Sequence, residues 1–167
     1  MRRLMLLRHA KSDWPTGVED HERPLGKRGR RDAPRMGEAM RERGFVPALA
    51  LVSTAKRTRQ TWDLVKPALG AVPERFEKAI YEAEPEAILE VIRATPAAVP
   101  SLLLVGHNPG LELTAAFLAA DGPERRALAG KFPTAALAVI DFAGENWHDI
   151  GQGQGTLTLF LTPAGLD

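Results

Sequence analysis

Three short apolar runs end in residues that could bind or attack a phosphate group. At their ends stand, in chain order, Arg8 with His9, Ser53 followed by Arg57, and His107 with Asn108. An imidazole can act as a nucleophile or a general base, and a guanidinium group binds an anion through parallel hydrogen bonds. Any one of these runs could simply be a strand that leads into a polar loop. Their repetition favours a common site.

Hydrophobic patterning predicts the elements that must position these groups. We expect strands at 3–7, 49–53, 101–106, 135–142 and 156–161, and a weaker one near 78–81. We expect helices at about 26–43, 57–69, 85–94 and 110–120. Alternation of strand and helix is typical of a parallel sheet. The last two strands flank a Gly-rich connection and should form an antiparallel hairpin.

The predicted fold class is therefore α/β, with a mostly parallel sheet, helices on both faces and an antiparallel C-terminal hairpin, in a single domain over residues 1–167. Parallel strands end at one edge of their sheet, so the polar groups should converge there. Asn108 and Pro109 should open the fourth helix, which places His107 beside an anion-attracting N-terminus. Pro34 should kink the first helix or mark a later start.

Composition limits the classes of function. The chain has 167 residues, 44% of them hydrophobic, and no cysteine, which excludes disulfides and suits a reducing cytoplasm. No apolar stretch is long enough for a signal peptide or a membrane span. Residues 1–60 carry 15 Lys/Arg against 7 Asp/Glu, and residues 61–167 carry 7 against 14. Such polarity fits an anionic partner. Because no nucleic-acid motif is present, a phosphate pocket explains it better than DNA or RNA.

Four segments carry a resemblance to a known family. They are LLRHAKS at 6–12, DHERPLGKRGRRDAPRMG at 20–37, VSTAKRTRQTW at 52–62 and VGHNPG at 105–110. In this order and spacing they resemble the histidine phosphatase superfamily, which has the phosphoglycerate-mutase-like fold, and within it the small SixA-type phosphohistidine phosphatases. The resemblance covers nearly the whole chain and is weakest after residue 120.

The resemblance implies that His9 is the nucleophile and is transiently phosphorylated. It implies that Arg8, Arg57 and His107 complete the phosphate pocket, with Arg23 at its rim. The neighbouring cations should keep His9 neutral, as a nucleophile must be. Ser53 and Asn108 each have two interpretations. Either side chain could contact phosphate, or it could cap the helix that follows it.

The sequence does not specify which residue acts as the general acid. Larger members of the superfamily use a carboxylic acid to protonate the leaving alcohol, and Glu82 is the nearest candidate here, with Asp13 and Glu19 behind it. An alkoxide needs such a proton, whereas imidazole, with a pKa of about 6.5, can leave as a neutral species. A pocket without a strong acid is therefore better suited to phosphohistidine than to phosphomonoesters.

The sequence predicts a phosphatase without metal or cofactor, since no carboxylate cluster stands at a strand end and the arginines would repel zinc. Its partner would be a phosphorylated protein or a small phosphorylated metabolite. The alternatives are a small-molecule phosphomonoesterase or phosphomutase, or a non-catalytic phosphoprotein-binding module. His21 could line the entrance, and His148 should be exposed. The basic run at 27–31 is either a solvated helix face or a docking surface for an acidic protein.

Overall fold

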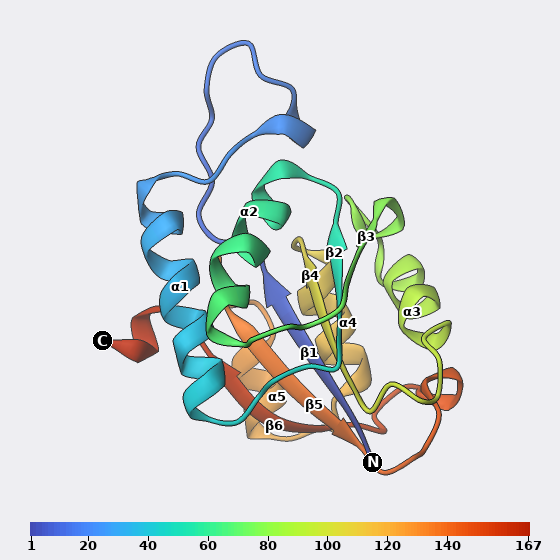
Figure 1. Cartoon of the computed structure of the whole chain (residues 1–167). Coiled ribbons are helices and arrows are strands. Elements are labelled where there is room, and N and C mark those ends of the chain that lie inside the picture. Colours follow the sequence, from blue (N-terminus) through green and yellow to red (C-terminus); the bar gives the residue numbers. More distant parts are fainter.

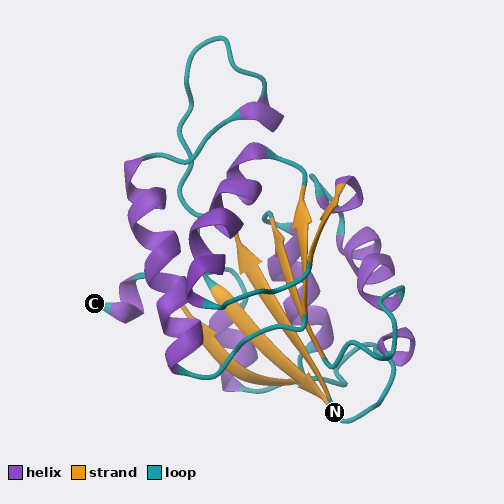
Figure 2. Cartoon of the chain, viewed as in Figure 1, coloured by secondary structure: helices purple, strands orange, loops and turns teal.

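A six-stranded mixed sheet forms the centre of the molecule in a computed structural model that describes residues 1–167 (Figures 1 and 2). Its spatial order is β3-β2-β4-β1-β5-β6. The strands are β1 (Arg2–Arg8), β2 (Leu49–Ser53), β3 (Glu74–Glu77), β4 (Ser101–Gly106), β5 (Leu137–Phe142) and β6 (Thr156–Leu161). The first four strands are mutually parallel, and β5 and β6 form an antiparallel hairpin whose β5 pairs with β1. This confirms the predicted fold class.

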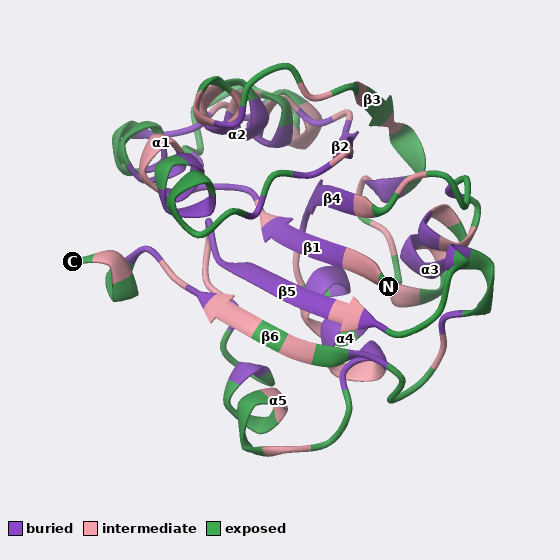
Figure 3. Ribbon diagram, turned by 60° about the horizontal axis from the view of Figure 1, so that its bottom comes forward, coloured by how far each residue is buried: buried purple, intermediate pink, exposed green.

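Helices cover both faces of the sheet, as Figure 3 shows. On one face lie α1 (Lys27–Glu42) and α2 (Lys56–Val65); on the other lie α3 (Pro85–Arg93), α4 (Gly110–Leu118) and α5 (Pro123–Leu128). Alternate residues of each strand face opposite sides. In β1, for example, Leu4 belongs to the core under α3 and α4, whereas Met5 belongs to the core under α1. Because β1 is buried on both faces, its sequence is a continuous apolar run.

Several local predictions were wrong. The weak strand is β3 at Glu74–Glu77, while 78–80 form a 3-10 turn, and α5 was not predicted at all. The first helix runs without interruption from Lys27 through Pro34, so the proline does not delay its start. The fourth helix begins at Gly110, as predicted, but Pro109 and not Asn108 is its N-cap, so Pro109 is not its first residue. None of the helices combines the length and hydropathy needed to cross a membrane.

The connection between β1 and α1 projects beyond the rest of the molecule, at the top of Figure 1. We call residues 12–25 the β1–α1 arm. Its two ends pair with each other: Ser12 and Leu25 form an isolated antiparallel bridge, and the Asp13 amide donates to the Pro24 carbonyl at 2.9 Å. The arm is therefore a closed loop that stands beside the carboxyl ends of the parallel strands.

Candidate active site

The three predicted strand ends meet at the carboxyl edge of the sheet. β4 lies between β1 and β2, and its register pairs Arg8 with Gly106 and Val52 with Val105. The residues that follow these strands must therefore be neighbours. The ring centroids of His9 and His107 are 5.4 Å apart. We call Arg8, His9, Arg57 and His107 the inner pocket.

His9 is buried, and its ring is held in one tautomer. Its Nδ1 lies 2.7 Å from the Ala10 carbonyl oxygen, an acceptor, so the proton of the neutral ring resides on Nδ1. The lone pair of Nε2 is then free to attack an electrophile. Burial lowers the pKa of His9 to about 4; the Ala10 bond opposes this lowering, and Arg57 and Arg8 add to it. At neutral pH the ring is therefore uncharged, which is the state that a nucleophilic imidazole requires.

His107 is oriented by Ser53. Its Nε2 lies 2.7 Å from the Ser53 hydroxyl, and burial together with His9 and Arg57 lowers its pKa to about 3. A Ser53 hydroxyl that donates to Nε2 leaves the His107 proton on Nδ1, which is buried and has no partner. The Ser53 hydroxyl thus orients His107, and toward the start of α2 that hydroxyl accepts only a long bond from the Ala55 amide, 3.4 Å.

In both arginines of the inner pocket, terminal nitrogens of the guanidinium group bond to protein oxygens, whereas Nε does not. Arg8 donates from Nη1 to the Phe132 carbonyl at 2.9 Å, and burial lowers its pKa. Arg57 donates from Nη1 to the Asp20 carbonyl at 2.7 Å and from Nη2 to the Asp20 carboxylate at 3.0 Å. In both residues the buried Nε has no partner. Two cations with unpaired donors and a donating imidazole can hold a phosphate.

The sequence analysis missed Asp20 and Tyr81. The Asp20 carboxylate accepts hydrogen bonds from Arg23, Arg57 and the Tyr81 hydroxyl. The Tyr81 bond and both arginines hold the pKa of that carboxyl far below its usual range. Burial and the Asp20 bond raise the pKa of Tyr81 to about 12. The Tyr81 ring also stands edge-on to His107, 5.6 Å away. Asp20 begins the family-like segment at 20–37, and that position could have marked it as a site residue. Tyr81 lies outside all four family-like segments, so nothing in the sequence marked it.

Arg23 and Asn108 have protein partners in this structure. Arg23 is buried, and its guanidinium group donates to the Asp13 carbonyl, the Asp20 carboxylate and the Ser12 hydroxyl. Asn108 donates to the Phe132 carbonyl, the same oxygen that Arg8 contacts, and accepts from the Glu112 amide in the first turn of α4. Asn108 therefore caps α4 from just outside the helix while it lies next to Arg8.

Glu82 lies beside the inner pocket. It lines a cavity of about 230 Å³ together with Asp20, Arg57, His107 and Asn108. Its φ of 51° is unusual for a non-glycine residue and turns the chain between Tyr81 and α3. The other two candidate acids, Asp13 and Glu19, are exposed residues of the β1–α1 arm and do not line this cavity.

The two remaining histidines, His21 and His148, lie in different parts of the fold. The His21 ring stands edge-on to Tyr81, 4.8 Å away, and its Nε2 lies 2.9 Å from the Thr54 hydroxyl, so it stands at the edge of the site. His148 is exposed in the β5–β6 connection, as expected. No group of three His, Cys, Asp or Glu side chains gathers in a way that could hold a metal ion.

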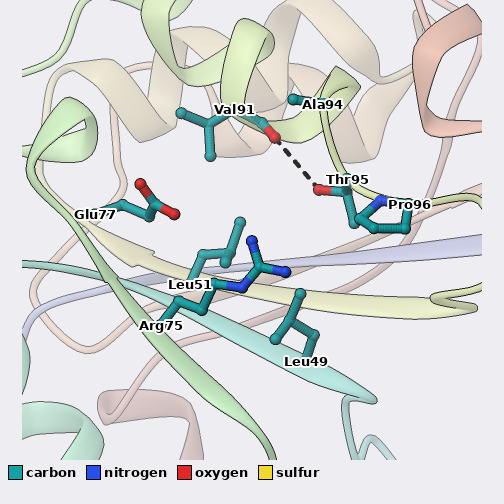
Figure 4. A pocket seen from close by; sticks show the side chains of 8 residues that line it. All are labelled: Leu49, Leu51, Arg75, Glu77, Val91, Ala94, Thr95 and Pro96. Atoms are coloured by element: carbon teal, nitrogen blue, oxygen red, sulfur yellow. Dashed lines mark hydrogen bonds between the residues drawn. The ribbon is translucent and has the colours of Figure 1, made fainter.

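A second cavity, of about 140 Å³, lies between β2, β3 and the end of α3 (Figure 4). Its floor includes Leu49 and Leu51, and Arg75 reaches in from β3. The Thr95 hydroxyl donates to the Val91 carbonyl at 3.3 Å, so the polar group on its far wall is satisfied. This cavity contains no histidine and none of the predicted site residues.

Comparisons with known proteins bear on the family and the fold of this chain. The family model described as "Histidine phosphatase superfamily (branch 1)" matches residues 4–88. An uncharacterized protein of Mycobacterium tuberculosis is 38% identical over 161 residues, which are 94% of this chain and 99% of the relative. Among solved structures, a candidate phosphohistidine phosphatase SixA from Agrobacterium tumefaciens is 34% identical, with a TM-score of 0.82 over 97% of this chain and 98% of its own.

A second solved structure, described as a candidate SixA phosphohistidine phosphatase from Nakamurella, is 31% identical with a TM-score of 0.83. The alignment covers 97% of this chain and 96% of that one. The family model ends at residue 88, before His107, but both structural matches extend over β4 and the C-terminal hairpin.

Proposed function

This chain belongs to the histidine phosphatase superfamily, and we propose that it removes phosphate from phosphohistidine in a protein, through a phospho-His9 intermediate and without a metal ion. The observation that carries the proposal is the set of unpaired buried donors. Arg8 Nε, Arg57 Nε and His107 Nδ1 all lack partners, and all three belong to the inner pocket. Buried polar atoms are normally paired, so three unpaired ones around one nucleophile support a site for an anionic group.

In the first step the Nε2 lone pair of His9 attacks the phosphorus atom of the substrate. The bond from phosphorus to the substrate imidazole breaks, and its electron pair stays on that imidazole. The leaving ring departs as neutral imidazole when its other nitrogen carries a proton. Arg8, Arg57 and His107 stabilise the negative charge on the transferring phosphoryl oxygens.

In the second step water attacks the phosphorus atom of phospho-His9. The His9 proton stays on Nδ1, and the N–H group donates a hydrogen bond to the Ala10 carbonyl. The His9 ring therefore also leaves as neutral imidazole. The proton lost by the water ends on the phosphate product. The two arginines supply the positive charge that a metal ion provides in other phosphatases.

One observation favours a second candidate, a small-molecule phosphomonoesterase. The cavity that contains His107 and Arg57 is also lined by Glu82, a carboxylic acid that could protonate an alkoxide leaving group. The preference for phosphohistidine rests on the SixA-like solved structures.

The test compares three substrates in excess EDTA: a histidine-containing protein phosphorylated with potassium phosphoramidate, a phosphoserine peptide and a sugar phosphate. We expect phosphate release from the first alone, with a phospho-His9 adduct recovered under alkaline conditions. Release from the sugar phosphate with none from phosphohistidine would establish the second candidate. Loss of turnover in EDTA, restored by one divalent metal, would require a different mechanism.

A further inference from the structure

The β1–α1 arm is held at its base by several internal hydrogen bonds. Beyond the pairing of its two ends, Arg23 joins three parts of it, because the guanidinium group donates to the Asp13 carbonyl at 3.0 Å, to the Asp20 carboxylate at 3.0 Å and to the Ser12 hydroxyl. The returning half of the arm is fastened to the site by Asp20, which binds Arg57 and Tyr81. A loop held at its base and along its returning half restricts the positions of the side chain that stacks on Arg23.

Trp14 is the side chain that this arm presents. Its ring stacks on the Arg23 guanidinium carbon at 3.2 Å, yet 76% of the residue is exposed. The other two tryptophans, Trp62 and Trp147, are fully buried. An exposed indole that is already stacked on a buried guanidinium group loses little conformational entropy when a partner covers it, and tryptophan is enriched among residues that dominate protein interfaces.

A basic surface lies at the base of the same arm. Four exposed cations stand in the first turns of α1: Lys27, Arg28, Arg30 and Arg31. The start of α1 packs closely on the arm's base, since a Cβ at Gly26 would collide with Asp13 and one at Gly29 with the Lys11 backbone. We call these four residues the basic turn.

The position of the basic turn is unfavourable for the helix itself. The N-terminal end of a helix dipole attracts negative charge, but the first turn of α1 contains no acidic residue. The buried Asp32 is the nearby carboxylate, and it lies 3.5 Å from Arg28 and 3.3 Å from Arg31. One carboxylate cannot neutralise four cations. Local rules that a sequence breaks without structural gain commonly mark functional sites.

We propose that Trp14 and the basic turn together form a docking surface for an acidic protein that carries the phosphohistidine substrate. This inference rests on the proposed function and names the kind of partner. The indole covers an apolar residue beside the phosphohistidine, and the cations attract the acidic surface around it. The arm ties this surface to the pocket, because the arm that presents Trp14 also supplies Asp20 to Arg57.

The experiment separates docking from chemistry with two substrates. One is an acidic histidine-containing protein phosphorylated with potassium phosphoramidate, and the other is phosphoimidazole, which is too small to reach Trp14 and His9 together. For Trp14→Ala and for Lys27→Glu/Arg30→Glu we expect kcat/KM to fall at least tenfold on the protein and less than twofold on phosphoimidazole. Phe76→Ala, an equally apolar exposed site on β3, is the matched control and should change neither.

A binding measurement makes the docking surface testable without turnover. In His9→Ala, acrylamide quenching of tryptophan fluorescence reports almost entirely on Trp14, because Trp62 and Trp147 are buried. The phosphorylated protein should protect Trp14 from quenching, and Lys27→Glu/Arg30→Glu should weaken that protection. Equal loss of kcat/KM on both substrates, or no protection of Trp14, would overturn the inference. Failure of wild type to hydrolyse either substrate would instead overturn the proposed function, with the quenching result still deciding on docking.

Discussion

The inner pocket and the β1–α1 arm both contain buried arginines, but they differ in how the guanidinium groups are paired. In the inner pocket Arg8 and Arg57 each leave a buried Nε without a partner. In the arm, Arg23 is as buried as Arg57 and more buried than Arg8, yet its Nε and both terminal nitrogens donate to protein oxygens and one face is covered by Trp14.

Pairing therefore distinguishes two uses of the same residue type. A fully paired arginine stabilises a loop, because all its desolvated donors are satisfied within the protein. An arginine with an unpaired buried donor carries a desolvation cost that a bound anion would offset. Residues of the two regions should accordingly respond differently to substitution, and each prediction below tests that difference.

The largest effect is expected for His9→Ala. The substitution removes the Nε2 that attacks phosphorus, so turnover of every substrate should fall roughly a thousandfold or more. The fold should persist, since the ring's one hydrogen bond is to the adjacent Ala10. Phosphate release and far-UV circular dichroism measure the two outcomes. Substantial activity in a folded variant would remove His9 as the nucleophile.

Arg57→Ala and Arg8→Ala should each lower kcat/KM, with a loss of transition-state stabilisation of about 3–4 kcal/mol. Each substitution deletes a charged donor to the transferring phosphoryl group. Arg30→Ala, an exposed cation of the basic turn, is the control on a small substrate such as phosphoimidazole and should have little effect there. Comparable losses for Arg30 and Arg57 on that substrate would mean that the pocket has been misplaced.

Arg23→Ala should act mainly on stability. It removes three hydrogen bonds from a buried cation, so the free energy of unfolding should fall by about 1–3 kcal/mol. Hydrolysis of phosphoimidazole should fall less than in Arg57→Ala. Urea unfolding and steady-state kinetics provide both values. An equal kinetic loss in the two variants would show that Arg23 contacts phosphate, as the family resemblance suggests.

The inner pocket should make stability depend on pH. The folded pKa values of His9 and His107, about 4 and about 3, lie below the ordinary value of 6.5. Between pH 7 and pH 4 the unfolded chain therefore binds protons that the folded protein does not, and stability falls as the pH falls. The lowered pKa of Asp20 acts in the same direction at still lower pH. Urea unfolding at pH 7.5 and pH 5 measures the slope, which His9→Asn should reduce.

The smallest effect is expected for Glu82→Gln on phosphohistidine, because neutral imidazole leaves without a strong acid. The same substitution should depress hydrolysis of an alkyl phosphate if wild type has that activity. Parallel assays on both substrates measure the difference. A large loss on phosphohistidine would identify Glu82 as a general acid; indifference on both substrates would show that Glu82 is the acid for neither.

The sequence alone was sufficient to predict the edge of the sheet at which the site lies. Apolar runs that end in Arg8-His9, Ser53 and His107 are local signals, and strands joined by helices are parallel, so their ends must meet. The pattern of strand and helix also predicted the C-terminal hairpin. The short strand β3 was misplaced by a few residues, and α5 was missed, because a few residues give too weak a periodic signal.

Only the tertiary structure determined how the side chains pair. Ser53 belongs to β2 and His107 follows β4, and nothing in either segment specifies the bond between them. Asp20 reaches Arg57 and Tyr81 only because the arm folds back over the site, and the same fold leaves Trp14 exposed. Periodicity reports which face of an element is buried, whereas hydrogen bonds between distant segments depend on where the packed elements bring their ends.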